Sequence, residues 1–151
     1  MLIQLKIENI ALIEIIEINF EKGLNILTGD SGSGKSLILD SLNVLFGGTN
    51  IPLNHLIRTG ADNCLIEARF SSSPKVNDWL KSSGFPKDSS ELKIQRKSYK
   101  KNGKIFSRYS LNNTSINKKL LEQLGLLLID FVGQSDTFLF ESNEFRRLII
   151  D

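Results

Sequence analysis

The feature that most constrains the fold is a glycine-rich segment at residues 29–36, which reads Gly-Asp-Ser-Gly-Ser-Gly-Lys-Ser. It satisfies the pattern G-x-x-x-x-G-K-[ST], in which a strand leads into a phosphate-binding loop and a helix follows. The flanking residues agree, because an apolar run at 24–28 precedes the loop and a helix-like run at 36–46 follows it. The sequence therefore predicts an α/β domain built around a phosphate site.

The residue types of this P-loop suit the binding of a triphosphate. Glycines let the backbone approach a ligand closely, and successive N–H groups then form a concave anion nest. The positive end of the following helix points at the phosphates. Lys35 is predicted to bridge the β- and γ-phosphates of ATP, and Ser36 is predicted to ligate Mg²⁺. The predicted nucleotide-binding residues are Gly29, Asp30, Ser31, Gly32, Ser33, Gly34, Lys35 and Ser36.

Hydrophobic period and turn residues predict the remaining elements. Strands are expected at 2–7, 12–20, 24–28, 65–70, 91–99, 104–111 and 126–132, and helices at 36–46, 75–83, 117–124 and from 145 onward. Asn102-Gly103 predicts a hairpin turn and Asn117 a helix cap. Gly125 is expected to end that helix, so that the apolar run after it forms a central parallel strand. The predicted fold class is an α/β P-loop NTPase with parallel core strands and an antiparallel β-rich lobe.

Composition narrows the class of protein without defining a reaction. The single cysteine, Cys64, and the single histidine, His55, exclude a disulfide framework and metal motifs that need several of either residue. No apolar run reaches the ~20 residues that span a bilayer. Residues 1–20 mix charged with apolar side chains, unlike a signal peptide. We therefore expect a cytoplasmic protein without a membrane partner.

A P-loop alone leaves the reaction open, because hydrolysis also needs an acidic residue for magnesium and a group that orients water. Asp130 follows four apolar residues in the manner of a Walker B strand, which would make the chain a self-contained small P-loop kinase. Gln134 lies just beyond this run and is a candidate for contact with Mg²⁺ or its water. From the residues alone, an ordinary loop glutamine is the simpler interpretation of Gln134.

Taken in order, several segments resemble the RecN family of SMC-like ABC ATPases, which act in bacterial DNA repair. The likeness covers nearly the whole chain and rests on residues 5–14, 23–29 with the P-loop, 38–42, 57–61, 66–70 and 128–134. Under this resemblance Gln134, in a Q-loop near 133–135, senses Mg²⁺ and the γ-phosphate and joins Lys35 as a catalytic residue. Asp130 becomes a strand-end residue. The family usually has histidines around this glutamine, whereas valine, glycine, serine and aspartate flank it here.

The resemblance also implies further parts of the protein, because heads of this family are split in sequence by a long coiled coil. No Ser-Gly-Gly signature and no sustained heptad pattern occur here. We therefore interpret residues 1–151 as the N-terminal segment of a head, without its coiled coil and C-terminal lobe. The implied partners are that lobe, a second copy of the head in an ATP-dependent dimer, and DNA.

The activity implied by the resemblance is that of an ATPase in double-strand break repair and recombination. This segment alone is expected to be inactive or very weak, since the signature and Walker B residues of the family lie in the C-terminal lobe. Such a protein is cytoplasmic, and nucleoid-associated when on DNA. A non-hydrolysing, nucleotide-gated interaction module is the remaining alternative.

Positive charge is concentrated in one part of the sequence. Between residues 93 and 119, lysines and arginines occur without any aspartate or glutamate. These basic residues are Lys93, Arg96, Lys97, Lys100, Lys101, Lys104, Arg108, Lys118 and Lys119. The basic hairpin at 91–111 is a candidate for contact with DNA phosphates through Lys97, Lys100, Lys101 and Lys104. The alternative is a solvated lobe whose basic edge strands resist aggregation.

Overall fold

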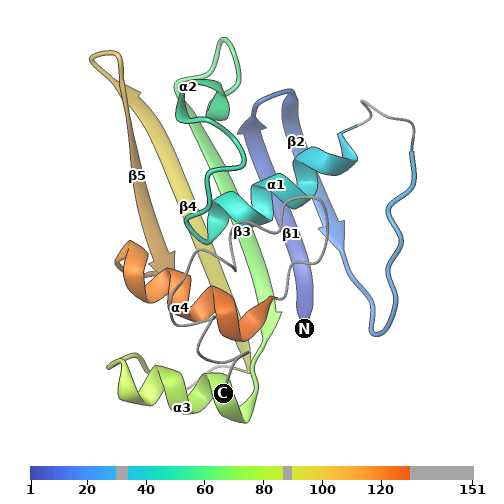
Figure 1. The fold of residues 1–151 in the computed structure, drawn as a ribbon, viewed down its shortest axis with the longest axis vertical. Coiled ribbons are helices and arrows are strands. Elements are labelled where there is room, and N and C mark those ends of the chain that lie inside the picture. Colours follow the sequence, from blue (N-terminus) through green and yellow to red (C-terminus); the bar gives the residue numbers. More distant parts are fainter. Residues whose placement is uncertain (30–33, 87–89, 130–151) are drawn as a thin grey trace, which may run out of the picture.

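A computed structural model describes residues 1–29, 34–86 and 90–129 of the 151-residue chain (Figure 1). In chain order its elements are β1 (Leu2–Ile10), β2 (Ile13–Asn19), α1 (Lys35–Leu45), α2 (Leu53–Leu56), β3 (Asn63–Ser71), α3 (Pro74–Ser82), β4 (Glu91–Lys101), β5 (Lys104–Leu111), β6 (Thr114–Ser115) and α4 (Lys118–Leu128). None of the helices in these ranges is both long and apolar enough to cross a membrane.

A six-stranded sheet with the order β2-β1-β3-β4-β5-β6 forms the body of the molecule. Its strands pair antiparallel, and in the register Ile7 of β1 lies opposite Ile16 of β2 and Ile66 of β3. Leu5 and Ile7 are fully buried, whereas the residues that alternate with them are only partly buried. This two-residue period gives the sheet one covered face and one face toward solvent.

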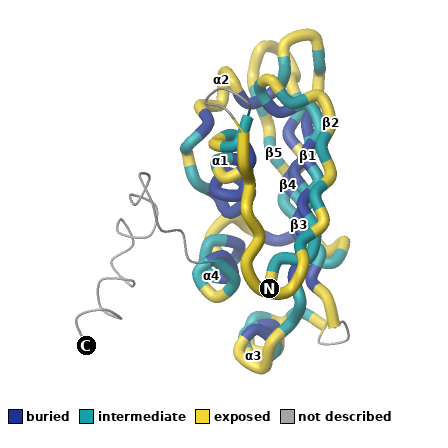
Figure 2. The backbone as a smooth tube through the Cα atoms, turned by 90° about the vertical axis from the view of Figure 1, so that its right-hand side faces the viewer, coloured by how far each residue is buried: buried dark blue, intermediate teal, exposed yellow. Residues whose placement is uncertain are grey.

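Helices cover the apolar face of the sheet. Figure 2 shows the sheet edge-on, with α1 and α4 on the same side and α3 beyond one end, next to α4. Phe46, directly after α1, packs edge-on against Phe70 of β3 with ring centroids 5.9 Å apart. Both phenylalanines are fully buried. The core therefore lies between the sheet and the C-terminal end of α1.

The predictions for the hairpin and for the cap of α4 are confirmed. Asn102 and Gly103 both have positive φ, 51° and 73°, as a two-residue hairpin turn requires. The Asn117 side chain accepts a hydrogen bond from the Leu120 N–H at 2.8 Å at the start of α4. The strands predicted at 2–7, 12–20 and 65–70, and the helices at 36–46 and 75–83, also form, with shifted ends.

The strand predicted at 24–28 is wrong. Residues 24–29 form no strand, and the Leu24 and Ile26 side chains are 87% and 72% exposed. A strand needs a neighbour that pairs with its N–H and C=O groups. None of the strands in the described part of the chain pairs with this run. The apolar run at 24–28 is therefore exposed and does not form a buried strand.

The prediction for residues 126–132 is also wrong as far as the structure describes them. Helix α4 runs through Gly125 to Leu128, and Gly125 does not end it. A Cβ at Gly125 would lie 2.9 Å from the Phe46 ring, so this glycine gives room for close packing. The leucines that follow are strong helix formers. The parallel core strands expected at 24–28 and 126–132 do not occur in the described residues, and the helix expected from 145 lies outside them.

Candidate nucleotide site

The N-terminal end of α1 provides the best-placed part of the predicted P-loop. Gly34 precedes the helix in the left-handed conformation, with φ 93°, which costs a residue with a Cβ more than it costs glycine. In the described residues, no acidic side chain lies in the first turn and no side chain caps it. The first backbone N–H groups and the helix dipole therefore favour an anion at this end.

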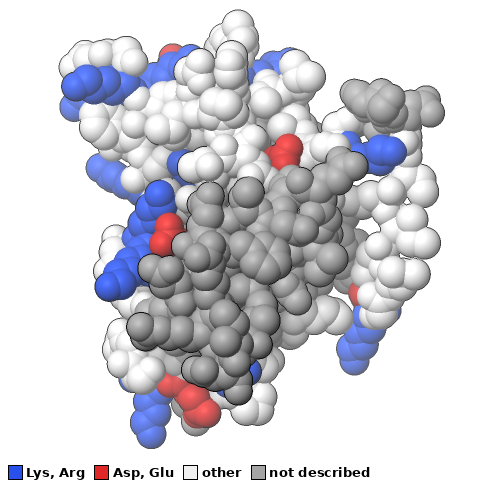
Figure 3. Space-filling view, in the orientation of Figure 1, with Lys and Arg blue, Asp and Glu red and all other residues white. Residues whose placement is uncertain are grey.

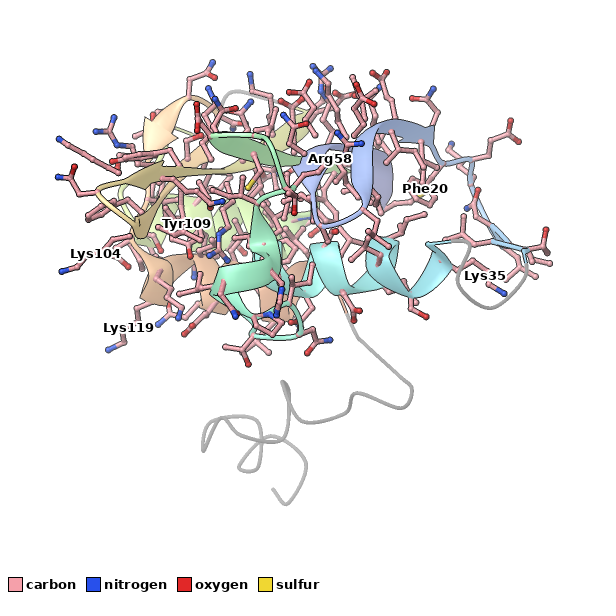
Figure 4. All side chains as sticks on the ribbon, turned by 90° about the horizontal axis from the view of Figure 1, so that it is seen from above. Phe20, Lys35, Arg58, Lys104, Tyr109 and Lys119 are labelled. Carbon is pink, nitrogen blue, oxygen red and sulfur yellow. The ribbon has the colours of Figure 1, made fainter. Side chains whose placement is uncertain are left out.

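Lys35 and Ser36 are the first two residues of α1. The Lys35 ammonium donates a hydrogen bond to the carbonyl oxygen of Gly29. Ser36 is exposed. In Figure 4, Lys35 lies at the opposite side of the molecule from Lys104 of the basic hairpin. The structure thus brings Gly29, Gly34, Lys35 and Ser36 together at one end of one helix.

The chemistry of these groups fits a nucleotide with magnesium. An ammonium and main-chain N–H groups bind phosphate oxygens, and a serine hydroxyl at this position is a Mg²⁺ ligand in P-loops. When bound, the metal neutralises charge on the phosphate oxygens. Gly34 supplies a left-handed residue directly before the helix that carries Lys35 and Ser36.

The other predicted site residues lie outside the described residues, and their roles stay predictions. They are Asp30, Ser31, Gly32 and Ser33 of the P-loop, Gln134 with the Q-loop at 133–135, and Asp130 of the alternative magnesium site.

The C-terminal end of α1 is fixed by buried polar contacts. Arg96 of β4 donates from Nη1 to the carbonyl oxygen of Val44 at 2.7 Å, and from Nη2 to the Ser107 hydroxyl at 3.1 Å. Its guanidinium lies 5.2 Å from the centroid of the Tyr109 ring. Burial lowers the pKa of Arg96 from its ordinary value. Asn43, also buried, accepts a hydrogen bond from the Asn50 N–H at 3.3 Å.

Arg96 is a residue that the sequence interpretation misplaces. The sequence alone groups it with the surface charges, but its side chain is only 6% exposed and lies on the covered face of the sheet. The two-residue alternation along β4 could have identified its burial, because Arg96 falls on the same face of the strand as buried Leu92 and Ile94. Arg96 therefore ties the sheet to the helix that carries Lys35.

The four lysines proposed for DNA contact, Lys97, Lys100, Lys101 and Lys104, are all exposed. Figure 3 shows lysine and arginine side chains gathered at the tip of the β4–β5 hairpin and along the neighbouring edge of the molecule. These lysines and the P-loop end of α1 are therefore separate surfaces.

Fold and site together define a P-loop NTPase domain. The AAA domain model matches residues 4–148, and the chain belongs to this family. A solved SMC ATPase, from work on ATP-driven dimerisation and DNA-stimulated activation, shares its fold with TM-score 0.71 at 24% identity. The match covers 99% of this chain and 97% of that one.

Within this class, the chain is an N-terminal RecN/SMC-like ATPase segment. It is 38% identical over 138 residues to the DNA repair protein RecN of Synechocystis, covering 91% of this chain and 23% of that protein. It is 32% identical over 153 residues to RecN of Bacillus subtilis, covering 100% of this chain and 26% of that protein. The resemblance found in the sequence is confirmed, and the chain spans about a quarter of the length of these relatives.

Proposed function

We propose that this chain is the ATP- and Mg²⁺-binding part of a RecN-like ATPase that acts in DNA double-strand break repair and recombination. The observation that carries the proposal is Lys35 at the start of α1, behind a left-handed Gly34, in a chain whose relatives are DNA repair proteins. Residues 29–36 hold the phosphates, and Lys35 neutralises the β- and γ-phosphates. Ser36 ligates Mg²⁺, and Gln134 senses the metal and the γ-phosphate.

The proposed partners begin with the C-terminal lobe of the same head. The exposed apolar side chains of Leu24 and Ile26 support this part, because water-exposed apolar runs next to a functional loop mark contact surfaces. A second head, joined in an ATP-dependent dimer, and DNA complete the set. The fold shared with an SMC ATPase that undergoes ATP-driven dimerisation supports the second head. The protein is cytoplasmic, and associates with the nucleoid through DNA.

Exchange of Lys35 for alanine tests the site. We expect Lys35→Ala to lower kcat for ATP hydrolysis by the full-length protein at least about 100-fold, because the variant lacks one preorganised donor to the phosphates. Phosphate release at saturating ATP measures this, and thermal unfolding without nucleotide should be unchanged. Lys22→Ala, on the exposed segment before the P-loop, is the matched control and should retain turnover.

The same assay on residues 1–151 alone separates the proposal from its rivals. We expect turnover at least about 100-fold below that of the full-length protein, since an isolated segment lacks groups that stabilise the transition state. Equal turnover in both would instead favour a self-contained kinase-like enzyme using Asp130. Nucleotide binding without turnover in the full-length protein would favour a nucleotide-gated interaction module.

A further inference from the structure

The register of the β4–β5 hairpin divides its basic residues between two faces. Arg96 and Lys100 continue the every-second-residue series of buried Leu92 and Ile94 along β4, so they belong to the face covered by helices. Lys97 and Lys101 point to the other face. Their partners across the strands are Arg108 and Lys104. We call Lys97, Tyr99, Lys101, Lys104, Phe106 and Arg108 the basic-aromatic face.

Two aromatic rings occupy the centre of this face. Tyr99 and Phe106 are direct cross-strand partners, and their rings are stacked with centroids 5.7 Å apart and an interplanar angle of 24°. Phe106 is 44% exposed, although burying a large aromatic side chain would stabilise the fold. The Arg108 guanidinium lies 5.6 Å from the centroid of the Tyr99 ring. An exposed ring pair with a cation beside it is a platform for a planar ligand.

The charges around the rings are arranged at a cost to the fold. Lys97 lies directly opposite Arg108, and Lys101 lies directly opposite Lys104. Like charges in directly opposed positions of a sheet are destabilising. Protection of a sheet edge does not explain Lys97, because β4 lies between β3 and β5. Lys97 has Leu65 of β3 opposite it on one side and Arg108 of β5 on the other. A polyanion bound to this face would offset the repulsion of both pairs.

A groove continues the face around the edge of the sheet. It has a volume of about 530 Å³ and is lined by Lys97, Arg108 and Lys118, among other residues of β5 and the segment before α4. In the register, β6 pairs with β5 at Ser110 and Leu111, and the Ile116 N–H also donates to the Tyr109 carbonyl oxygen at 3.2 Å, so this pairing covers the end of β5 that is far from the hairpin tip. Positive side chains thus follow a path from the hairpin tip toward the start of α4.

We propose that the basic-aromatic face binds single-stranded DNA, with bases stacked on Tyr99 and Phe106 and phosphates held by the four surrounding cations. Aromatic stacking with a positive groove along the backbone is how proteins bind single strands without reading their sequence. A duplex keeps its base faces stacked inside the helix, so it would meet only the charges. This inference rests on the proposed DNA-related function, and it names the form of DNA and the residues that hold it.

Oligonucleotides with and without bases test the stacking step in the full-length protein. Fluorescence anisotropy would measure the Kd for a labelled thymidine oligomer and for an abasic deoxyribose-phosphate oligomer of the same length. We expect the thymidine oligomer to bind at least about fivefold more tightly. In Tyr99→Leu/Phe106→Leu this preference should disappear, while leucine keeps apolar bulk on the strands. Equal binding of both oligomers by the parent protein would overturn the proposal.

Charge variants test the role of the cations in holding phosphates. Lys97→Gln/Arg108→Gln should weaken the binding of both oligomers to the same extent. The slope of log Kd against log salt should fall by about 1.4, or about 0.7 for each phosphate that the variant no longer neutralises. Lys119→Gln, on α4 and directed into solvent in Figure 4, is the control and should leave both Kd values unchanged. Unchanged binding in the Lys97/Arg108 variant, or a parent protein that binds only duplex DNA, would rule this face out.

ATP turnover of the same preparations separates this inference from the proposed function. If variants of the basic-aromatic face hydrolyse ATP normally and bind the thymidine oligomer like the parent, the proposed role of this face is wrong and the proposed function stands. A parent protein that neither hydrolyses ATP nor binds DNA would remove the proposed function as well.

Discussion

The two ends of α1 have opposite environments. At its start, Lys35 and Ser36 lie at or near the surface and follow a segment, residues 21–29, that is exposed throughout. At its end, every residue from 41 to 47 is buried, and Val44 accepts a hydrogen bond from the buried Arg96. A single helix of 11 residues therefore joins an open end, where the phosphate site is proposed, to an end fixed in the core.

This difference would let α1 hold its N–H donors in fixed positions for the proposed phosphate. The catalytic value of a donor depends on its being held in place before the ligand arrives. Here the fixed end supplies that rigidity, through Phe46, Asn43 and the contact between Arg96 and the helix carbonyl. The open end keeps its first backbone N–H groups available, because no acidic side chain of the described residues lies in its first turn and no side chain caps it.

The largest effect is expected from the fixed end. Phe46→Ala removes a fully buried ring that packs on Phe70, and should lower the free energy of unfolding by about 3–5 kcal/mol. Urea unfolding followed by fluorescence or circular dichroism measures this. Leu39→Ala, on the same helix but 54% exposed, is the matched control and should change stability by no more than about 0.5 kcal/mol. Equal losses in the two variants would remove the contrast between the ends.

A smaller loss is expected where α4 meets the fixed end. In Gly125→Ala the new Cβ would lie 2.9 Å from Cγ and Cδ1 of Phe46, so the ring or the helix must shift. Overpacking of this kind costs about 1–3 kcal/mol, which urea unfolding would show. Combining it with Phe46→Leu should cost less than the sum of the single changes, because the smaller side chain leaves room. Additive losses would mean that the contact with Phe46 is not the cause.

Much of the fold is predictable from residues that act locally. Asn102-Gly103 requires left-handed backbone that few other pairs adopt, and the Asn117 side chain can reach a helix N–H from its own position. The alternation of Ile7 with charged neighbours likewise requires only a sheet with one covered face. The start of α1 directly after Gly34 is predictable for the same reason, since the glycine-rich motif is followed by a helix.

The errors concern residues whose structure depends on distant partners. The run at 24–28 has the composition of a buried strand, but composition does not supply the neighbouring strand that it needs. Gly125 resembles a helix stop until Phe46, far away in the sequence, is found against it. Arg96 reads as a surface charge until Val44 and Ser107 are placed beside it. Pairwise contacts of this kind leave no local pattern in one sequence.

The smallest stability effect is expected at the open end, where a second glycine is required for a different reason. Gly34 has φ 93°, yet no described atom lies within 4 Å of a Cβ built on it. Gly34→Ala should therefore cost about 1–2 kcal/mol through backbone conformation alone, and should also weaken nucleotide binding by displacing the first N–H groups of α1. Urea unfolding and nucleotide titration of the same protein would measure the two effects.

Asparagine separates conformation from space at this position. Gly34→Asn adds a larger side chain, but asparagine tolerates the left-handed region better than alanine does. We expect Gly34→Asn to be more stable than Gly34→Ala. A steric cause, as at Gly125, predicts the reverse order, because the larger residue would then clash more. The order of these two variants therefore tests whether the open end is limited by backbone geometry while the fixed end is limited by packing.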